Sequence, residues 1–161
     1  MRPTHSMKRS YPERPIVGVG ALVFRGEEVL LIKRGKPPRE GQWSIPGGMQ
    51  QLGESVAEAA CREVREEAGI EIAIKETIAV VDSISRDAEG RVQYHYTLVD
   101  LWAEWQAGEA KAGDDAAEVA WVALDRLAPY RLWLETERVI ALGALRRKAP
   151  AGSAPAIHMV R

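Results

Sequence analysis

The sequence predicts an α/β protein in which a mixed β-sheet lies between helices. Segments with strand periodicity lie before, between and after two segments with helical periodicity, and glycine-rich turns separate them. A chain of 161 residues with 46% hydrophobic and 28% charged residues is long enough to bury one core. The expected layout is an N-terminal extension (residues 1–15), one domain (residues 16–147) and a flexible C-terminal tail (residues 148–161).

The first half of the domain contains a predicted hairpin and a predicted helix. Apolar runs at residues 16–24 and 29–34 flank a tight turn at Gly26. Ser55 and Glu58 then form a capping box, and Gly69 can end a helix in a left-handed conformation, so we expect a helix over residues 56–68. Helical spacing predicts that its buried face consists of Ala57, Ala60, Cys61, Val64 and Ala68.

The second half contains four predicted strands and a second helix. Residues 70–74 and 77–85 are expected to form two strands, and residues 92–105 a longer one beyond the turn at 87–91. A short apolar strand is expected at residues 119–124, and a helix at residues 132–145. The apolar side chains available for the buried side of this helix are Trp133, Val139, Ile140 and Leu142.

Composition excludes several classes of partner. The formal net charge of -1 gives no broad electrostatic attraction to nucleic acid or to anionic membranes, and no apolar run approaches the roughly 20 residues of a membrane span. Cys61 is the single cysteine, so no internal disulfide can form, and the N-terminus lacks the apolar stretch of a secretory signal. We therefore expect a cytoplasmic protein with a small-molecule partner, and with neither nucleic acid nor membrane as a partner.

Glu63, Glu66 and Glu67 form an acidic edge beside the buried face of the first helix. One interpretation is a surface charge network in which Arg62 pairs with Glu58 and Glu66. It leaves Glu63 and Glu67 as a like-charge pair, but the cost of about 0.2 to 0.5 kcal/mol is too small to reject it. The other interpretation is a Mg²⁺ site, because Mg²⁺ prefers oxygen ligands and is usually shared with substrate phosphates.

The surrounding residues favour the metal site. Gly48, five residues, Glu54, seven residues and then REVREEAGI (residues 62–70) match the Nudix signature without a departure. The chain therefore resembles the Nudix hydrolases, and the likeness spans about residues 16–145. The resemblance implies a Nudix-type α/β/α sandwich with a mixed sheet, and Mg²⁺- or Mn²⁺-dependent hydrolysis of a nucleoside diphosphate linked to another group.

The resemblance also implies roles for individual residues. Glu63, Glu66 and Glu67 would bind the metal together with the Gly48 carbonyl, as a set of four ligands. Arg62 would orient the glutamates, and Glu54 would lie in the outer shell of the site. The general base would be a signature glutamate or an acid of a later loop, where Asp115 is the candidate beside Asp114 and Glu118. A solvated acidic loop explains those three equally well.

The substrate is less closely defined by the sequence. The most similar members are small bacterial ADP-ribose pyrophosphatase-like proteins, which implies hydrolysis of ADP-ribose or an ADP-sugar to AMP and a sugar phosphate. Residues 70–90 contain no proline, although ADP-ribose hydrolases often carry one about fifteen residues beyond the signature. Hydrolysis of canonical or oxidised (deoxy)nucleoside triphosphates therefore stays open, as does a non-catalytic nucleotide-sensing module. A homodimer through sheet or helix surfaces is also compatible with the sequence.

Several residues outside the signature are candidates for binding the substrate. Arg34, Trp43 and His95 are the first candidates, for a phosphate, an adenine ring and a phosphate respectively. Packing in the core or sheet is the commoner role of Trp43 and of the other aromatic candidates, Tyr94, Tyr96, Trp102 and Trp105. A histidine in a strand, such as His95, is likewise more often structural. The other basic candidates flank the loop before the signature, and most are expected on the surface: Arg25, Lys33, Lys36 and Arg39.

Overall fold

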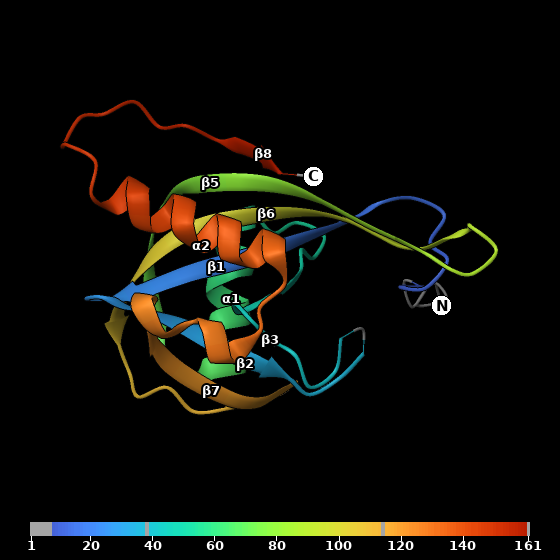
Figure 1. Cartoon of the computed structure of the whole chain (residues 1–161), viewed down its shortest axis with the longest axis horizontal. Helices are drawn as coiled ribbons and strands as arrows, with labels where there is room; N and C mark the ends of the chain where they lie inside the picture. The colour runs from blue at the N-terminus through green and yellow to red at the C-terminus, as the bar shows by residue number, and fades with distance from the viewer. Residues whose placement is uncertain (1–7, 38, 114, 161) are drawn as a thin grey trace.

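One mixed β-sheet forms the centre of the fold, and a helix covers each of its faces (Figure 1). The computed structural model describes residues 8–37, 39–113 and 115–160. The strands are β1 (Ile16–Arg25), β2 (Glu28–Arg34), β3 (Trp43–Ser44), β4 (Gly47–Met49), β5 (Glu71–Arg86), β6 (Val92–Ala107), β7 (Ala116–Ala123) and β8 (His158–Val160). The helices are α1 (Val56–Ala68) and α2 (Leu134–Arg147), with short 3-10 turns at Leu124–Arg126 and Ala128–Tyr130.

The sheet is mixed because β1 has neighbours of both directions. Its strand order is β3-β2-β1-β6-β5-β8, with β4 paired to β1 and β7 paired to β2. β1 runs parallel to β6 and antiparallel to β2 and β4. The predicted α/β class with a mixed sheet between helices is therefore confirmed.

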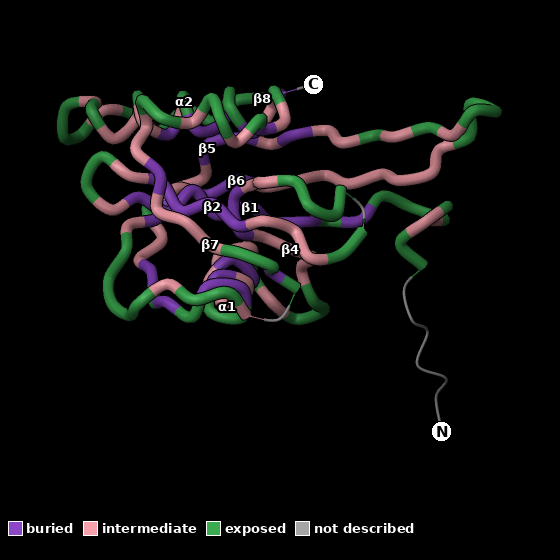
Figure 2. The backbone as a smooth tube through the Cα atoms, turned by 60° about the horizontal axis from the view of Figure 1, so that its bottom comes forward, coloured by how far each residue is buried: buried purple, intermediate pink, exposed green. Residues whose placement is uncertain are grey.

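The two faces of the sheet build two cores. Side chains alternate along a strand, so Leu22 and Phe24 of β1 pack into the core beneath α2, while Ala21 and Val23 pack into the core beneath α1. Figure 2 shows the buried parts of the strands in the middle, between α1 on one side and α2 on the other. Both faces of β1 are therefore covered by packed side chains over residues 21–24.

The strands β5 and β6 form a long hairpin that projects from the body of the protein (Figure 1). The prediction of two separate strands at residues 70–74 and 77–85 was wrong, because both belong to β5. The pairing with β6 shifts register between Ile74 and Glu76 and again between Thr77 and Ala79. Such bulges bend a strand without ending it, so the irregular pattern was mistaken for a break.

The predicted bounds of α1 are confirmed, but its buried face is rotated from the expected one. Ser55 Oγ accepts a hydrogen bond from the Glu58 backbone N–H at 3.2 Å, and Gly69 has a left-handed φ of 68°. Ala59 and Glu67 are buried, whereas Ala57 and Cys61 are only partly buried. The reason is that β4 covers the edge of α1 that carries Glu67, as the Gly47–Glu67 hydrogen bond shows.

The second helix begins two residues later than predicted and also ends two residues later, at Arg147. The chain makes a 3-10 turn at Ala128–Tyr130, and Arg131 has a left-handed φ of 48°, which is incompatible with a continuous helix. Trp133 consequently lies at the N-cap instead of on the buried side of the helix. Within the described residues, neither helix is long and apolar enough to cross a membrane.

Both terminal segments contact the hairpin. The backbone N–H of Tyr11 donates to the Gln93 carbonyl at 2.7 Å, so part of the N-terminal extension lies against β6. The expected flexible tail differs from the structure at its end, where β8 pairs in parallel with β5 and Val160 is buried in the core beneath α2. The composition of residues 148–161 predicts a flexible tail, but the edge of β5 provides backbone partners for His158–Val160.

Candidate active site

Arg62 lies at the centre of the signature residues. Its Nε and Nη2 donate to the two carboxylate oxygens of Glu54 at 2.5 and 3.1 Å, and Nη1 donates to Glu63 Oε1 at 2.8 Å and to Glu66 Oε2 at 3.1 Å. Nη2 also donates to the Met49 carbonyl at 3.0 Å. These bonds hold the pKa of Glu54 below its ordinary value. One guanidinium group therefore positions three carboxylates and connects α1 to the preceding loop.

Glu67 is the most deeply buried acid of the signature. Its side chain faces β4, where Oε2 accepts a hydrogen bond from the Gly47 backbone N–H at 2.9 Å, and only 7% of the residue is exposed. Burial raises the pKa of Glu67 to about 8, and the negative charge of Glu63 acts in the same direction. Burial also raises the pKa of Glu63 itself, although the hydrogen bond from Arg62 opposes that change. Two adjacent carboxylates are thus removed from water.

Gly48 lies against Glu63, and no side chain fits between them. A Cβ atom added to Gly48 would overlap the whole carboxyl group of Glu63. The backbone of β4 therefore lies so close to Glu63 that only glycine fits at position 48 without displacing the carboxylate. This is the position at which the Gly48 carbonyl is expected to act as a metal ligand.

The substitution Gly48→Ala tests this close approach. The added methyl group must displace the Glu63 carboxylate, which lies at the end of a flexible side chain, so the fold should lose little stability. We expect the affinity for Mg²⁺ to fall by about tenfold or more, as for other changes that reorient a metal ligand, with a melting temperature close to that of wild type. Calorimetric titration with Mg²⁺ and a thermal melt measure the two effects. Unchanged Mg²⁺ affinity would contradict the placement of Glu63 and Gly48 in one metal site.

The donor set fits a hard divalent cation. Glu63, Glu66 and Glu67 supply carboxylate oxygens, and Gly48 supplies a carbonyl, which are the ligand types that Mg²⁺ and Mn²⁺ accept. A bound cation would also offset the cost of ionising Glu63 and Glu67 away from water. In the part of the chain that the structure describes, no three acidic, histidine or cysteine side chains converge on one point. Glu63 and Glu66 are hydrogen-bonded to Arg62, and Glu67 is hydrogen-bonded to Gly47.

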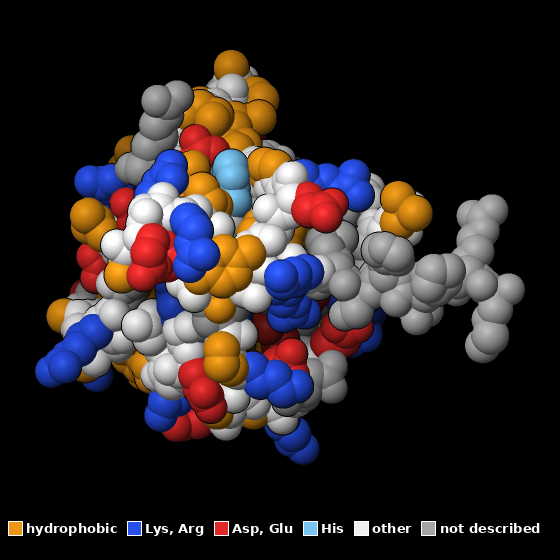
Figure 3. All heavy atoms as spheres, turned by 90° about the vertical axis from the view of Figure 1, so that its right-hand side faces the viewer, with side chains coloured by type: hydrophobic (Ala, Val, Ile, Leu, Met, Phe, Trp, Pro, Cys, Tyr) orange, Lys and Arg blue, Asp and Glu red, His pale blue; other side chains and the backbone are white. Residues whose placement is uncertain are grey.

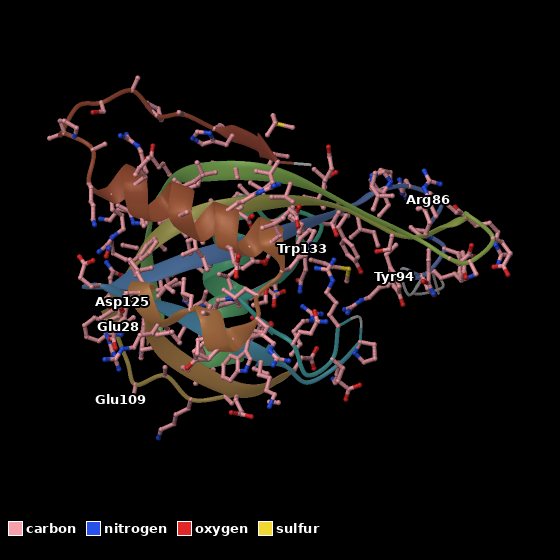
Figure 4. All side chains as sticks on the ribbon, viewed as in Figure 1. Glu28, Arg86, Tyr94, Glu109, Asp125 and Trp133 are labelled. Atoms are coloured by element: carbon pink, nitrogen blue, oxygen red, sulfur yellow. The ribbon has the colours of Figure 1, made fainter. Side chains whose placement is uncertain are left out.

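A cavity of about 580 Å³ extends from these acids across the face of the sheet beneath α2. Acidic, aromatic and basic side chains line this cavity, and the acidic ones include Glu63, Glu66 and Glu67. The aromatic lining residues are Trp43, Tyr94, Tyr96 and Trp133, and the basic ones are Arg9, Arg34, Lys36 and Arg39. In Figure 4, Trp133 lies at the start of α2, while Tyr94 lies out on the hairpin. The cavity therefore joins an acidic part to an aromatic and basic part.

The structure separates the predicted substrate contacts into two groups. Arg34 and Trp43 line the cavity, as do Lys36, Arg39, Tyr94 and Tyr96. His95 does not, because side chains alternate along β6 and its neighbours Tyr94 and Tyr96 both face the cavity. Four further candidates also lie elsewhere: Arg25 pairs with Glu28, Lys33 with Glu118, Trp102 packs into the core beneath α2, and Trp105 donates to the Gly108 carbonyl.

The candidates for the general base also differ in whether they line the cavity. Asp115 lines the cavity and forms an ion pair with Lys36, and its charge contributes to the raised pKa of Glu67. Glu118 is paired to Lys33 at 2.8 Å across β2 and β7 and does not line the cavity. Asp114 lies outside the described residues. Asp115 is therefore the only described member of the three that is near the acids of α1.

Arg9, Trp133 and Asp100 are among the residues of the cavity that were not predicted from the sequence. Arg9 comes from the N-terminal extension, and Trp133 was assigned to the core of α2. The third, Asp100, is only 5% exposed in the middle of β6, and burial raises its pKa to about 7. A single acid within the apolar run TLVDLWA was a usable signal for a buried functional group, since a charge is rarely buried without a role.

The buried acid Asp100 predicts a specific pH dependence of stability. Its pKa is about 7 in the folded protein and about 3.8 when unfolded, so folding takes up a proton between these values. The stability that Asp100 contributes is thus complete below about pH 4 and is lost as the pH rises through 7. Asp100→Asn should remove this loss, so that from pH 5 to 9 the metal-free variant gains on the order of 3 kcal/mol relative to wild type.

Urea unfolding of both proteins at several pH values measures this difference. Glu67 contributes a slope of the same sign, but it is present in both proteins and cancels in the comparison. Parallel curves for wild type and Asp100→Asn would show that Asp100 keeps an ordinary pKa.

The comparisons with known proteins agree with the geometry. A family model described as NUDIX domain matches residues 14–143. An ADP-ribose pyrophosphatase of Methanocaldococcus jannaschii is 36% identical over 126 residues, which cover 78% of this chain and 71% of that protein. The NAD-capped RNA hydrolase NudC of Pseudomonas aeruginosa is 37% identical over 123 residues, covering 74% of this chain and 39% of that protein. The crystal structure of a MutT NUDIX hydrolase from Burkholderia pseudomallei superposes with a TM-score of 0.71 at 35% identity, covering 81% of this chain and 98% of the other.

Proposed function

Because the chain belongs to the Nudix hydrolases, which act on pyrophosphate bonds, we propose that it cleaves ADP-ribose or another ADP-sugar into AMP and a sugar phosphate. One observation supports this proposal above the others: a single cavity contains both the acids of α1 and a set of aromatic side chains. A diphosphate at the acids would leave the adenosine within reach of the aromatic part. The ADP-ribose pyrophosphatase among the relatives has the same substrate by name.

The residues of this chain would divide the work of the reaction. Glu63, Glu66, Glu67 and the Gly48 carbonyl would hold Mg²⁺, with Mn²⁺ as the second ion to test. When bound, the metal would supply positive charge at the diphosphate and lower the pKa of water. Arg34, Lys36 and Arg39 line the cavity and would orient the phosphate oxygens. Arg62 would keep Glu63 and Glu66 in place through the hydrogen bonds that it already makes.

Two groups of the chain could accept the proton of the attacking water. Glu67 is buried beside Gly47, and Asp115 lines the same cavity from the loop before β7. The dependence of kcat on pH distinguishes them in Glu67→Gln and Asp115→Asn, at saturating metal and substrate. The substitution of the general base should abolish the acidic limb of the profile. If both variants retain that limb, neither residue is the base.

A triphosphate substrate is the second candidate function, and the basic side chains favour it. Arg9, Arg34, Lys36 and Arg39 supply four cationic groups to one cavity, which suits a longer phosphate chain. The MutT hydrolase of known structure is 35% identical to this chain. The face shown in Figure 3 carries Lys and Arg side chains scattered among acidic and hydrophobic ones, which gives no support to binding a nucleic acid through an extended basic patch.

A substrate panel with product identification tests the proposal. ADP-ribose, other ADP-sugars, NAD and nucleoside triphosphates are incubated with Mg²⁺ or Mn²⁺, and both products are identified by mass spectrometry in ¹⁸O-labelled water. We expect AMP and ribose 5-phosphate from ADP-ribose, and the product that carries ¹⁸O shows which phosphorus is attacked. Preferred release of pyrophosphate from triphosphates would establish the second function. Metal-independent binding without turnover of any substrate would indicate a nucleotide sensor.

A further inference from the structure

Asp100 is a buried acid without a protein partner in the wall of the cavity. It lies on β6, 5% exposed, and on the same face of that strand as Leu98 and Tyr96, which line the cavity with it. Within the described residues, no hydrogen bond or ion pair to its carboxyl group is found, and burial alone accounts for its raised pKa. No described side-chain oxygen is both fully buried and without a hydrogen-bond partner, so the carboxyl oxygens of Asp100 keep access to the cavity, where a ligand or water can pair with them.

The neighbouring strand provides room for this carboxyl group. Gly20 pairs with Asp100 across β1 and β6, and a Cβ atom on Gly20 would overlap Asp100 Oδ1. The carboxyl group therefore occupies the space above Gly20, which itself lines the cavity. Ile45 lies on the same side, close to that position. Asp100 is thus turned toward the cavity, and no side chain on Gly20 covers it.

We propose that Asp100 is the specificity-determining residue of a base subsite, where its carboxyl group forms paired hydrogen bonds with one edge of adenine. The amino group of adenine is a donor and the adjacent ring nitrogen is an acceptor. A protonated carboxyl group matches this edge, because it offers one O–H donor beside one acceptor oxygen. This inference rests on the proposed function, since it assumes an adenine nucleotide in the cavity.

Three features of the surroundings support an uncharged, planar ligand. Burial raises the pKa of Asp100 to about 7, which keeps a proton available near neutral pH. Ile45, Leu98 and Trp133 line the cavity and offer apolar surface to a ring. The acids of α1 come from the other face of the sheet, so the diphosphate and the base would occupy different parts of the cavity.

The test combines two variants with an analogue that lacks one hydrogen-bonding group. Asp100→Asn keeps one donor and one acceptor, whereas Asp100→Leu has a similar volume and neither. kcat and KM are measured for ADP-ribose and for the analogue with hydrogen in place of the 6-amino group. We expect wild type to prefer ADP-ribose by about 10- to 100-fold in kcat/KM, chiefly through KM. Asp100→Leu should lose that preference, and Asp100→Asn should keep it.

Each outcome supports the inference or overturns it. It is overturned if Asp100→Leu hydrolyses ADP-ribose like wild type, or if this variant loses the same factor on both substrates. Thermal melts show whether Asp100→Leu folds. If it does not, the inference is tested by whether wild type and Asp100→Asn both prefer ADP-ribose to the analogue without the amino group. A wild-type preference below about threefold overturns it.

Direct binding separates this inference from the proposed function. If wild type fails to hydrolyse ADP-ribose, the proposed function fails, and calorimetry with AMP and with its 6-desamino analogue still tests Asp100. Tighter binding of AMP to wild type and Asp100→Asn, with equal binding of both nucleotides to Asp100→Leu, supports the base subsite. Equal binding of both nucleotides to wild type overturns it.

Discussion

Replacing Glu67 by glutamine should lower kcat by about a thousandfold at saturating Mg²⁺, without unfolding the protein. A carboxylate that binds the metal or accepts a proton contributes several kcal/mol to the transition state, and an amide does neither. The Gly47 N–H can still donate to the amide oxygen, so the contact between β4 and α1 should remain. Steady-state kinetics on the best substrate of the panel measures the loss.

Although Glu67→Gln should lose activity, its stability without metal should be higher than that of wild type at alkaline pH. The pKa of Glu67 is raised to about 8 by burial, so wild type loses stability as the pH rises through that value. The glutamine variant has no such group and should melt at a higher temperature than wild type at about pH 9. Glu109→Gln is a matched control, because Glu109 is exposed on the loop before β7 and lies away from the cavity (Figure 4). Retention of more than a tenth of wild-type activity by Glu67→Gln would refute the role of Glu67.

Replacing Arg62 by alanine should reduce both stability and activity. The Arg62 side chain is only 20% exposed and donates to Glu54, Glu63 and Glu66, so its removal leaves three neighbouring carboxylates without their shared partner. We expect the free energy of unfolding to fall by about 3 kcal/mol, as when one member of a largely buried ion pair is removed. kcat/KM should fall by about a hundredfold, because the carboxylates are no longer held in place.

Arg65 provides the control on the same helix. It donates to Glu71 at 2.7 and 2.8 Å through an exposed pair, so Arg65→Ala should cost less than about 1 kcal/mol and leave the activity unchanged. Urea unfolding and kinetics are compared for the two variants. Added Mg²⁺ should restore part of the stability of Arg62→Ala, because a cation replaces the lost positive charge. Equal effects of the two substitutions would place Arg62 in a surface charge network, the alternative interpretation of the acidic helix.

Local patterns predicted most of the fold. The capping box at Ser55 and the glycine at position 69 defined α1, because both act through backbone groups within one turn of the helix. The predictions failed where long-range contacts decide. A bulge let β5 continue past Lys75, and the free edge of β5 recruited the last strand, β8. Neither the register of a long hairpin nor an unpaired edge is visible in the local sequence.

The sequence by itself determined the family of this protein. Gly48, Glu54 and the acids of residues 62–67 have fixed spacings along a loop and a helix, and a helix converts spacing into position within a few residues. Membership of the Nudix hydrolases follows from these residues.

Only the tertiary structure decided which other residues share the cavity with them. Arg9, Asp100 and Trp133 come from the N-terminal extension, β6 and the start of α2, so no local spacing relates them. Because successive side chains of β6 point to opposite faces of the sheet, Tyr94 and Tyr96 line the cavity and His95 does not. The three acids predicted to bind the metal lie on one helix and can be recognised from its period, whereas the cavity is lined by side chains that meet only when distant segments pack.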